Sequence, residues 1–191
     1  MYLCYMDESG DPGSTQPPEP GERRRRGGVS PTPTYTVSAV LVNDVHWVET
    51  FENMIVFRRW LRSTYGLPLT AEIKGAQLAK GTGPWRKLRL SPAARHEIYR
   101  WAMVFQGRRA RDLKTFAVVV RKDKCEATHD VRAVGWQYAF ERVNTFTRKQ
   151  GSRVMLLPDS GQYHWVRALA RKMRRFAPVP SAYGTLGDSR R

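Results

Sequence analysis

The chain has 191 residues, of which 41% are hydrophobic and 11% aromatic. A chain of this size can bury a sizeable core and suits one domain, or one domain with an appendage. No apolar run approaches the roughly 20 residues that span a bilayer. The N-terminus reaches an acidic pair, Asp7 and Glu8, without the basic start or the apolar stretch of a secretory signal. We therefore expect a soluble, cytoplasmic protein without a membrane helix.

The charge is strongly positive, because 33 Lys and Arg outnumber 17 Asp and Glu and give a formal net charge of +16. Most of the surplus lies in the second half, where 20 basic and 8 acidic residues follow position 95, after 13 basic and 9 acidic residues before it. Such a surplus favours a polyanionic partner, since basic side chains release counterions from a phosphate backbone. The alternative is a generic solvated basic surface.

The first part of the chain predicts two strands joined by a long loop. Residues 2–6 are apolar and lead abruptly into Asp-Glu-Ser-Gly-Asp-Pro-Gly, so a strand is expected to end at or beside Asp7. Residues 13–33 are rich in Pro, Gly and Ser and contain four consecutive arginines, which predicts a flexible basic loop. Residues 35–42 are β-branched and aromatic and are expected to pair with the first strand.

The middle of the chain predicts two helices separated by a loop. Asp44 is a candidate cap for a helix over residues 45–65, where apolar residues follow helical spacing. Residues 67–90 are rich in Gly, Pro and Lys, so we interpret them as mostly loop. Ser91 followed by proline is a typical helix start and predicts a helix over residues 93–106.

The last part alternates strands and helices. Residues 114–121 are the clearest central strand of the sequence. Asp130 is a candidate cap for a helix over residues 131–149. A further buried strand at residues 154–157 is followed by a helix over residues 162–176, with apolar residues on one side and arginines on the other.

This order of elements predicts the α/β class, with a mixed β-sheet flanked by helices. We expect a single domain over residues 1–191, with the flexible basic loop at 13–33 and an irregular tail at 177–191.

Two aspartates, Asp7 and Asp159, stand where separate apolar strands are expected to end, and turn residues follow each of them. Open α/β sheets place their ligands at such strand ends. If the two strands are neighbours, both carboxylates face one crevice and suit Mg²⁺ or Mn²⁺, which prefer oxygen ligands. A divalent ion there activates water and neutralises a scissile phosphate, so the matching reaction is phosphodiester hydrolysis. The alternative for each aspartate is an ordinary turn residue.

The first thirteen residues, Met-Tyr-Leu-Cys-Tyr-Met-Asp-Glu-Ser-Gly-Asp-Pro-Gly, resemble the opening of the family called domain of unknown function 3800, which is assigned a ribonuclease-H-like fold. Glu-Ile-Lys-Gly at 72–75 is similar to the family's Glu-x-Lys-Gly signature, and the strand-ending Asp159 also fits, so the resemblance spans nearly the whole chain. The first motif is fairly specific, and the others are weak alone. The resemblance implies that Asp7 is the first metal ligand, that Glu72 and Asp159 are further carboxylates, and that Glu8 supports the turn.

One departure from that family concerns its acidic cluster. Family members usually continue past the last helix to a Gln-x-Ala-Asp motif, whose aspartate completes the cluster. The sequence here ends at residues 187–191 without this motif, and Asp188 stands in the wrong context to replace it. We expect either a fragment or a C-terminally shortened protein. Full two-metal catalysis is in doubt, and a single-metal or inactive site is an open alternative.

Basic and aromatic residues supply candidate contacts to nucleic acid. Lys74 is a candidate phosphate contact, with a solvated loop lysine as the alternative. Trp85 and Tyr163 are candidates to stack on a base, with core packing as their alternative. The further basic candidates are Arg58, Arg59, Arg62, Arg167, Arg171, Arg174 and Arg175.

Together these patterns and the family resemblance predict an Mg²⁺- or Mn²⁺-dependent nuclease that hydrolyses DNA or RNA, with Asp7 and Asp159 as metal-binding and catalytic residues; the resemblance adds the ribonuclease-H-like type and Glu72 as a lesser candidate. The first alternative is a non-catalytic basic module that binds nucleic acid with an incomplete acidic site. The second is a hydrolase of a smaller phosphorylated substrate.

The two cysteines, Cys4 and Cys125, are too few for a disulfide scaffold or a recognisable zinc site, and both are expected to be reduced.

Overall fold

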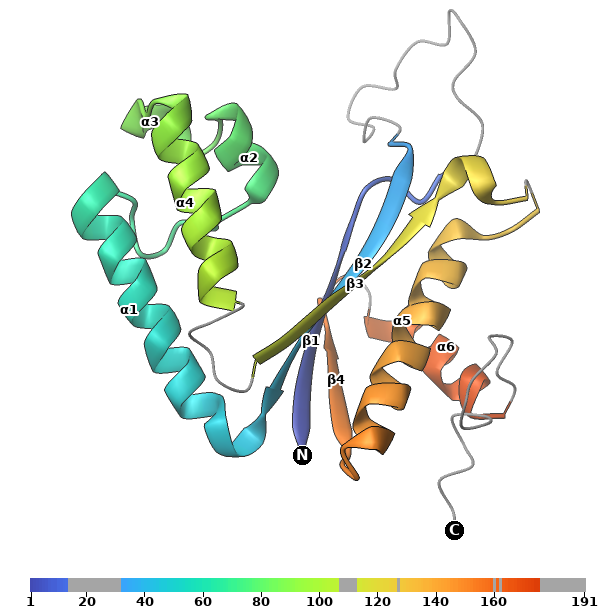
Figure 1. Ribbon diagram of the computed structural model, residues 1–191. Helices are drawn as coiled ribbons and strands as arrows, with labels where there is room; N and C mark the ends of the chain where they lie inside the picture. Colours follow the sequence, from blue (N-terminus) through green and yellow to red (C-terminus); the bar gives the residue numbers. More distant parts are fainter. Residues whose placement is uncertain (14–31, 107–112, 127, 160, 162, 176–191) are drawn as a thin grey trace, which may run out of the picture. The chain divides into compact units, whose positions relative to one another are not determined.

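The computed structural model describes residues 1–13, 32–106, 113–126, 128–159, 161 and 163–175 (Figure 1). The chain divides into two compact units. Unit 1 comprises Met1–Leu41 and Thr115–Arg191, and unit 2 is Val42–Lys114. Each unit has a hydrophobic core of its own. Most of the loop predicted at 13–33 and the tail predicted at 177–191 lie outside the described residues.

Unit 1 is built on a four-stranded mixed sheet in the order β3-β2-β1-β4. Its strands are β1 (Tyr2–Ser9), β2 (Thr34–Asn43), β3 (Leu113–Arg121) and β4 (Val154–Pro158). β1 and β4 are parallel, with a register that runs from Tyr2 opposite Val154 to Met6 opposite Pro158. The arrow of β2 points in the direction opposite to β1 (Figure 1). The predicted α/β class and the pairing of the first two strands are therefore confirmed.

Both strands that were predicted to be buried lie at the edges of the sheet. β3 forms one edge and β4 the other. In β3 the side chain of Val120 is buried, whereas its neighbour Val119 is 56% exposed, and Met155 of β4 is 48% exposed. A run of apolar residues is typical of a strand buried on both faces, but here only alternate side chains point into the core. The prediction of a central strand at residues 114–121 is therefore wrong.

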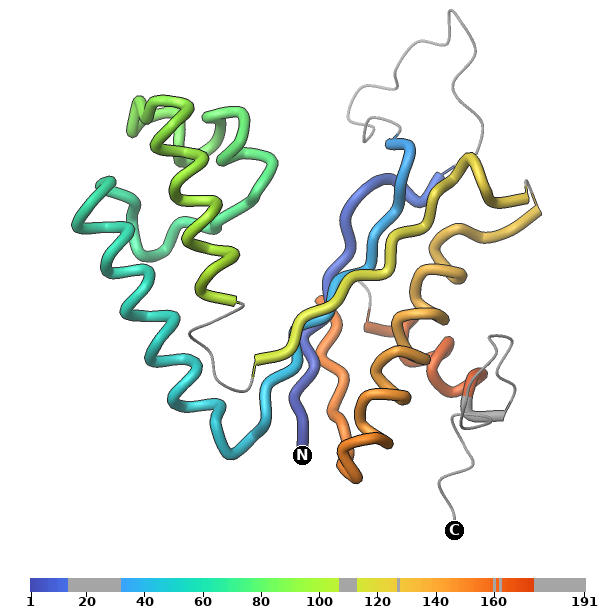
Figure 2. Tube along the Cα trace, viewed as in Figure 1, coloured from blue at the N-terminus to red at the C-terminus, as the bar shows by residue number. Residues whose placement is uncertain are grey.

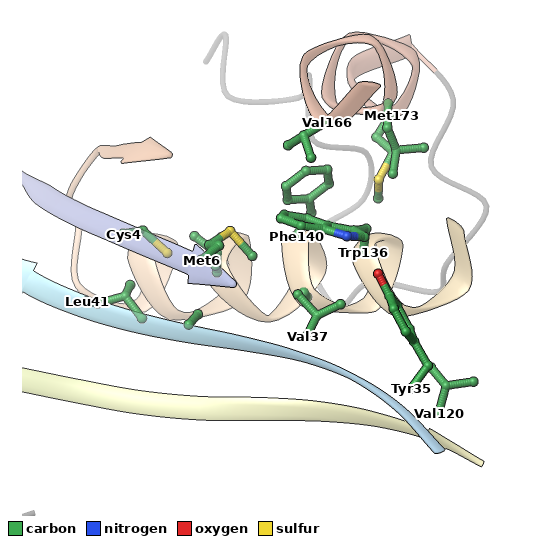
Figure 3. Close-up of a cluster of buried hydrophobic side chains, with 14 of the residues drawn as sticks. Cys4, Met6, Tyr35, Val37, Leu41, Val120, Trp136, Phe140, Val166 and Met173 are labelled. Carbon is green, nitrogen blue, oxygen red and sulfur yellow. The ribbon is translucent and has the colours of Figure 1, made fainter. Parts of the chain in front are cut away.

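Two helices, α5 (Val131–Lys149) and α6 (Tyr163–Arg175), pack on one face of this sheet (Figure 1). Side chains of both helices meet those of β1 and β2 in the core, where Trp136 and Phe140 of α5 lie among the strand residues (Figure 3). Asp130 caps α5, because its carboxylate accepts the backbone N–H groups of Arg132 and Ala133 at 3.0 and 3.1 Å. The predicted cap and bounds of this helix are confirmed.

Unit 2 is helical. Its helices are α1 (Trp47–Tyr65), α2 (Gly75–Lys80), α3 (Trp85–Leu88) and α4 (Pro92–Val104). The Ser91 hydroxyl caps α4 as predicted, since it accepts the N–H of Ala94 at 3.2 Å. Asp44 lies in a short 3₁₀ turn, η1 (Asp44–His46), and α1 begins three residues later, so the prediction that Asp44 caps the long helix is wrong.

The segment predicted as mostly loop, residues 67–90, contains the two short helices α2 and α3. Their buried side chains Leu78 and Trp85 belong to the core of unit 2. Helices of one or two turns are marginal without tertiary packing, and the glycines and prolines that surround them dominate the local composition. The core contacts therefore hold helices that the local sequence did not predict.

Candidate acidic site and basic surfaces

Asp159 directly follows β4 and lies in register with Asp7, which stands two residues before the end of the parallel strand β1. The last register pair of the ladder joins Met6 and Pro158. The N–H of Asp159 then donates to the carbonyl of Met6 at 3.2 Å. In a parallel ladder this bond brings Asp159 level with Asp7, one step beyond the last pair. The condition for the predicted site, that the two strands are neighbours, is therefore met.

Asp7 faces away from the core of unit 1. Side chains alternate between the two faces of a strand. In β1, Cys4 and Met6 are buried in the core, whereas Tyr5 and Asp7 are exposed on the opposite face. Asp159 is exposed as well. Both carboxylates are thus accessible to a large ligand from solvent.

Glu8, the neighbour of Asp7, faces the core side and joins three elements. It accepts hydrogen bonds from the Tyr35 hydroxyl and from Trp136 Nε1, the latter at 3.1 Å. Its Oε2 also lies 3.7 Å from Nε of Arg132, whose guanidinium is 4.5 Å from the centre of the Trp165 ring. Figure 3 shows the Tyr35 hydroxyl pointing toward the Trp136 indole. Glu8 therefore connects β1 with β2 and α5 directly behind Asp7, rather than supporting only the turn.

This network keeps the Tyr35 phenol neutral. Burial raises the pKa of Tyr35 well above its usual range, and the hydrogen bond to Glu8 raises it further. The sequence carried one signal for the network, because Glu8 is in phase with the buried Cys4 and Met6 along β1. The turn residues that follow Glu8 concealed this signal, since they suggested that the strand ends at Asp7, whereas β1 continues to Ser9.

The turn after β1 is fixed by close contacts. Gly10 has a φ of +92°, and a Cβ there would overlap the carbonyl oxygen of Thr34, so the position requires glycine. The N–H of Asp11 donates to Thr32 Oγ1 at 2.9 Å. The Asp11 carboxylate pairs at 3.4 Å with the ammonium of Lys122, a lysine that is only 4% exposed. These contacts hold the end of β1 that carries Asp7.

Glu72 and Lys74 belong to unit 2, whereas Asp7 and Asp159 belong to unit 1. Glu72 and Lys74 form an ion pair with each other at 3.2 Å, and their side chains are 75% and 54% exposed. Such an exposed pair contributes about 0–1 kcal/mol to stability. The roles of Glu72 as a further metal ligand and of Lys74 as a phosphate contact stay predictions.

Two arginines of α6 lie on the core side of the sheet, whereas Asp7 faces the other side. Arg167 and Arg171 are exposed on a helix that covers the core face of the sheet. Asp7 points to the opposite face. The side chains of Arg174 and Arg175 lie outside the described residues, although their backbone is part of α6. The predicted contacts of Arg167 and Arg171 to nucleic acid would therefore lie on the side of the sheet opposite to Asp7, and those of Arg174 and Arg175 stay predictions.

Two further candidates have structural roles. Arg58 donates through Nε to the Leu69 carbonyl at 2.9 Å and through its terminal nitrogen to the Ala71 carbonyl, so it holds the segment after α1 in place. Trp85 is 1% exposed and packs in the core of unit 2, which excludes it as a stacking platform. Tyr163 is 47% exposed, so stacking on a base stays a prediction for this residue.

The acidic site offers oxygen ligands alone, and its role as a metal site stays a prediction. Within the described ranges, no group of three or more His, Cys, Asp or Glu side chains is placed to hold a metal ion. Asp7 and Asp159 therefore offer two carboxylates. Mg²⁺ commonly keeps several waters and binds through one or two carboxylates together with substrate phosphates.

Comparison with protein-family models, curated proteins and solved structures finds no match to this chain. The resemblance to the domain of unknown function 3800 and its ribonuclease-H-like fold thus stays a prediction. The structure establishes the coarser class, a mixed α/β fold with a four-stranded sheet and helices. In the part of the chain that the structure describes, no helix has the length and apolar character needed to cross a membrane.

Proposed function

We propose that this protein is an Mg²⁺- or Mn²⁺-dependent nuclease that hydrolyses phosphodiester bonds of DNA or RNA, with Asp7 and Asp159 holding the cation. The observation that carries this proposal is the parallel pairing of β1 with β4, which brings the two aspartates level at adjacent strand ends. Ligands of open α/β sheets lie at this end of the strands. A ribonuclease-H-like fold, as the sequence resemblance implies, is the corresponding architecture.

The cation, the two aspartates and the residues around Asp7 would have different roles in the proposed reaction. A cation bound between Asp7 and Asp159 would supply Lewis-acid activation of water and of the scissile phosphate. The carboxylates orient that cation from two strands whose spacing the sheet fixes. The Glu8 network and the contact of Asp11 with Lys122 hold the backbone at the end of β1 in place, and this backbone carries Asp7.

A polymeric phosphodiester is the substrate class that the charge favours. The net charge of +16 attracts a polyanion. The release of counterions from the polyanion then makes its binding to the protein more favourable. The exposed position of both aspartates also suits a long polymer better than a small enclosed substrate.

The test is a cleavage assay with labelled single- and double-stranded DNA and RNA, with and without Mn²⁺ or Mg²⁺. Wild type is expected to cut only with metal. Asp7→Asn and Asp159→Asn should each lower the rate roughly 100-fold or more, because metal-ion catalysis supplies several kcal/mol. Glu72→Gln tests the lesser candidate. Glu49→Gln, which removes an exposed carboxylate on α1, is the matched control and should cut normally. Metal-dependent cutting that survives both aspartate substitutions would overturn the proposal.

The second candidate is a non-catalytic module that binds nucleic acid through its basic surface. It is favoured by the two-carboxylate site, because no larger ligand group is found among the described residues. Under this alternative, wild type and Asp7→Asn bind the same strands with equal affinity, the affinity falls steeply with salt, and neither protein cuts.

A further inference from the structure

Unit 2 contains a small aromatic pocket between α1 and α4, whose paths lie alongside each other (Figure 2). The pocket has a volume of about 200 Å³ and is lined by Trp60, Trp101, Val104 and Phe105. The centres of the Trp60 and Trp101 rings are 6.0 Å apart and their planes cross at 65°. Phe57 stacks on both Phe105 and Trp60 and thereby supports the wall from behind.

The pocket lies at the margin of the core and is not part of it. The fully buried side chains of unit 2 are Leu61, Leu67, Leu78, Trp85 and Ile98. All four lining residues of the pocket are only partly buried. Two tryptophans are thus left with ring surface that a ligand can cover. Pockets for drug-sized ligands usually measure roughly 300–1,000 Å³, so this smaller hollow suits a single flat ring system.

Unit 2 has an excess of basic residues, and two of its arginines neighbour the tryptophans of the pocket in sequence, which favours an anionic partner. Residues 42–114, which form unit 2, include fourteen Lys and Arg but only six Asp and Glu. The guanidinium of Arg100 lies 5.1 Å from the centre of the Trp101 ring, and Arg59 is exposed next to Trp60 on α1. The Glu97 carboxylate also belongs to α4 and accepts a hydrogen bond from the Tyr65 hydroxyl at 3.2 Å. A ligand with a flat apolar ring and an attached phosphate matches this combination.

We propose that this aromatic pocket binds one unpaired nucleobase of a single-stranded nucleic acid. Stacking on tryptophan accepts any base, because every base has a π-face, and the neighbouring arginines attract the backbone phosphates. A base inside a duplex is covered by its neighbours and cannot enter the pocket. The inference rests on the proposed function in one respect, since it takes nucleic acid as the partner, and it adds a preference for single strands.

The test compares two labelled strands of equal length, oligothymidine and an abasic deoxyribose-phosphate polymer, by fluorescence anisotropy at low salt. The two strands carry the same phosphates, so their difference in affinity isolates the bases. Wild type is expected to bind oligothymidine roughly 5- to 150-fold more tightly, as base stacking on aromatic side chains predicts. Trp101→Ala should lose this preference and keep its affinity for the abasic strand.

Two further variants keep the result decisive. Val104→Trp fills the pocket without removing an aromatic wall and should lose the preference as well, so it decides the question if Trp101→Ala fails to fold. Trp47→Ala removes an aromatic side chain that stacks on Phe51 elsewhere on α1, and it should keep the preference. Circular dichroism confirms that each variant is folded.

The outcomes separate this inference from the proposed function. Equal binding of both strands by wild type, or a preference that survives in the folded pocket variants, would overturn the base pocket and leave the nuclease proposal standing. Binding of neither strand would overturn nucleic acid as the partner, and with it both proposals. An apolar side chain of another protein as the true occupant would give equal binding of the two strands.

Discussion

At Glu8 one carboxylate meets three donors from two other elements of unit 1, the Tyr35 hydroxyl of β2 and the Trp136 indole and Arg132 guanidinium of α5. Glu8→Ala should lower the free energy of unfolding by about 1–3 kcal/mol, because buried donors lose their acceptor. Glu8→Gln keeps an acceptor oxygen and should lose less. Urea denaturation measures both variants, and equal losses would show that the negative charge of the carboxylate, rather than its size or one acceptor oxygen, dominates at this position.

The two cysteines differ in their burial, so their reactivity toward alkylating reagents should differ as well. Burial raises the pKa of the Cys4 thiol to about 12, so almost no thiolate is present at pH 8. Cys125 is only partly buried. Treatment of the folded protein with iodoacetamide at pH 8 should therefore modify Cys125 and spare Cys4, as read by peptide mass spectrometry. Modification of Cys4 should require denaturant, and rapid labelling of Cys4 in the folded protein would contradict its position in the core.

At the scale of the elements, the packing of α5 on β2 depends on Gly135. A Cβ at this position would lie 3.0–3.2 Å from atoms of Tyr35 and Val37. Gly135→Val should lower the free energy of unfolding by about 1–3 kcal/mol, as expected for overpacking at a tight contact. Gly161→Val is the matched control, since a Cβ there meets nothing within 4 Å. The comparison is made by thermal and urea unfolding, and a neutral Gly135→Val would mean that α5 and β2 separate easily.

The sequence predicted those elements whose signals are local. α5 has a capping aspartate that accepts two backbone N–H groups and a long helical pattern, and its bounds were predicted correctly. The edge position of β3 could not be predicted, because strand order depends on pairing between distant segments. The helices α2 and α3 were missed because the burial of Leu78 and Trp85, rather than helix propensity, stabilises them.

The candidate site was likewise predictable from the sequence only where its signals are local. Asp7 and Asp159 were found from the turn residues that follow them, and the parallel β1–β4 ladder brings them level. The Glu8 network needed knowledge of which face of β1 is buried. The aromatic pocket of unit 2 could not be found from spacing, because Trp60 and Trp101 come from helices about forty residues apart and meet only in the folded chain.

At the scale of the whole molecule, the two proposals assign different tasks to the two units. Unit 1 carries the carboxylates that would hold the cation, and unit 2 carries the pocket that would hold a base. Most of the positive charge lies in the second half of the chain. Charge gives affinity for phosphate without selectivity, whereas the carboxylates and the pocket would supply the reaction and the preference for single strands.

The most direct test of the central claim measures Mn²⁺ affinity by electron paramagnetic resonance for wild type, Asp7→Asn, Asp159→Asn and the double variant. If the two carboxylates share one ion, each single substitution should weaken binding at least about tenfold, and the double variant should lose less than the sum of the two single losses in free energy. Glu49→Gln should bind Mn²⁺ as wild type does. Unchanged affinity in both single variants, or losses that simply add, would contradict a cation shared between the ends of β1 and β4.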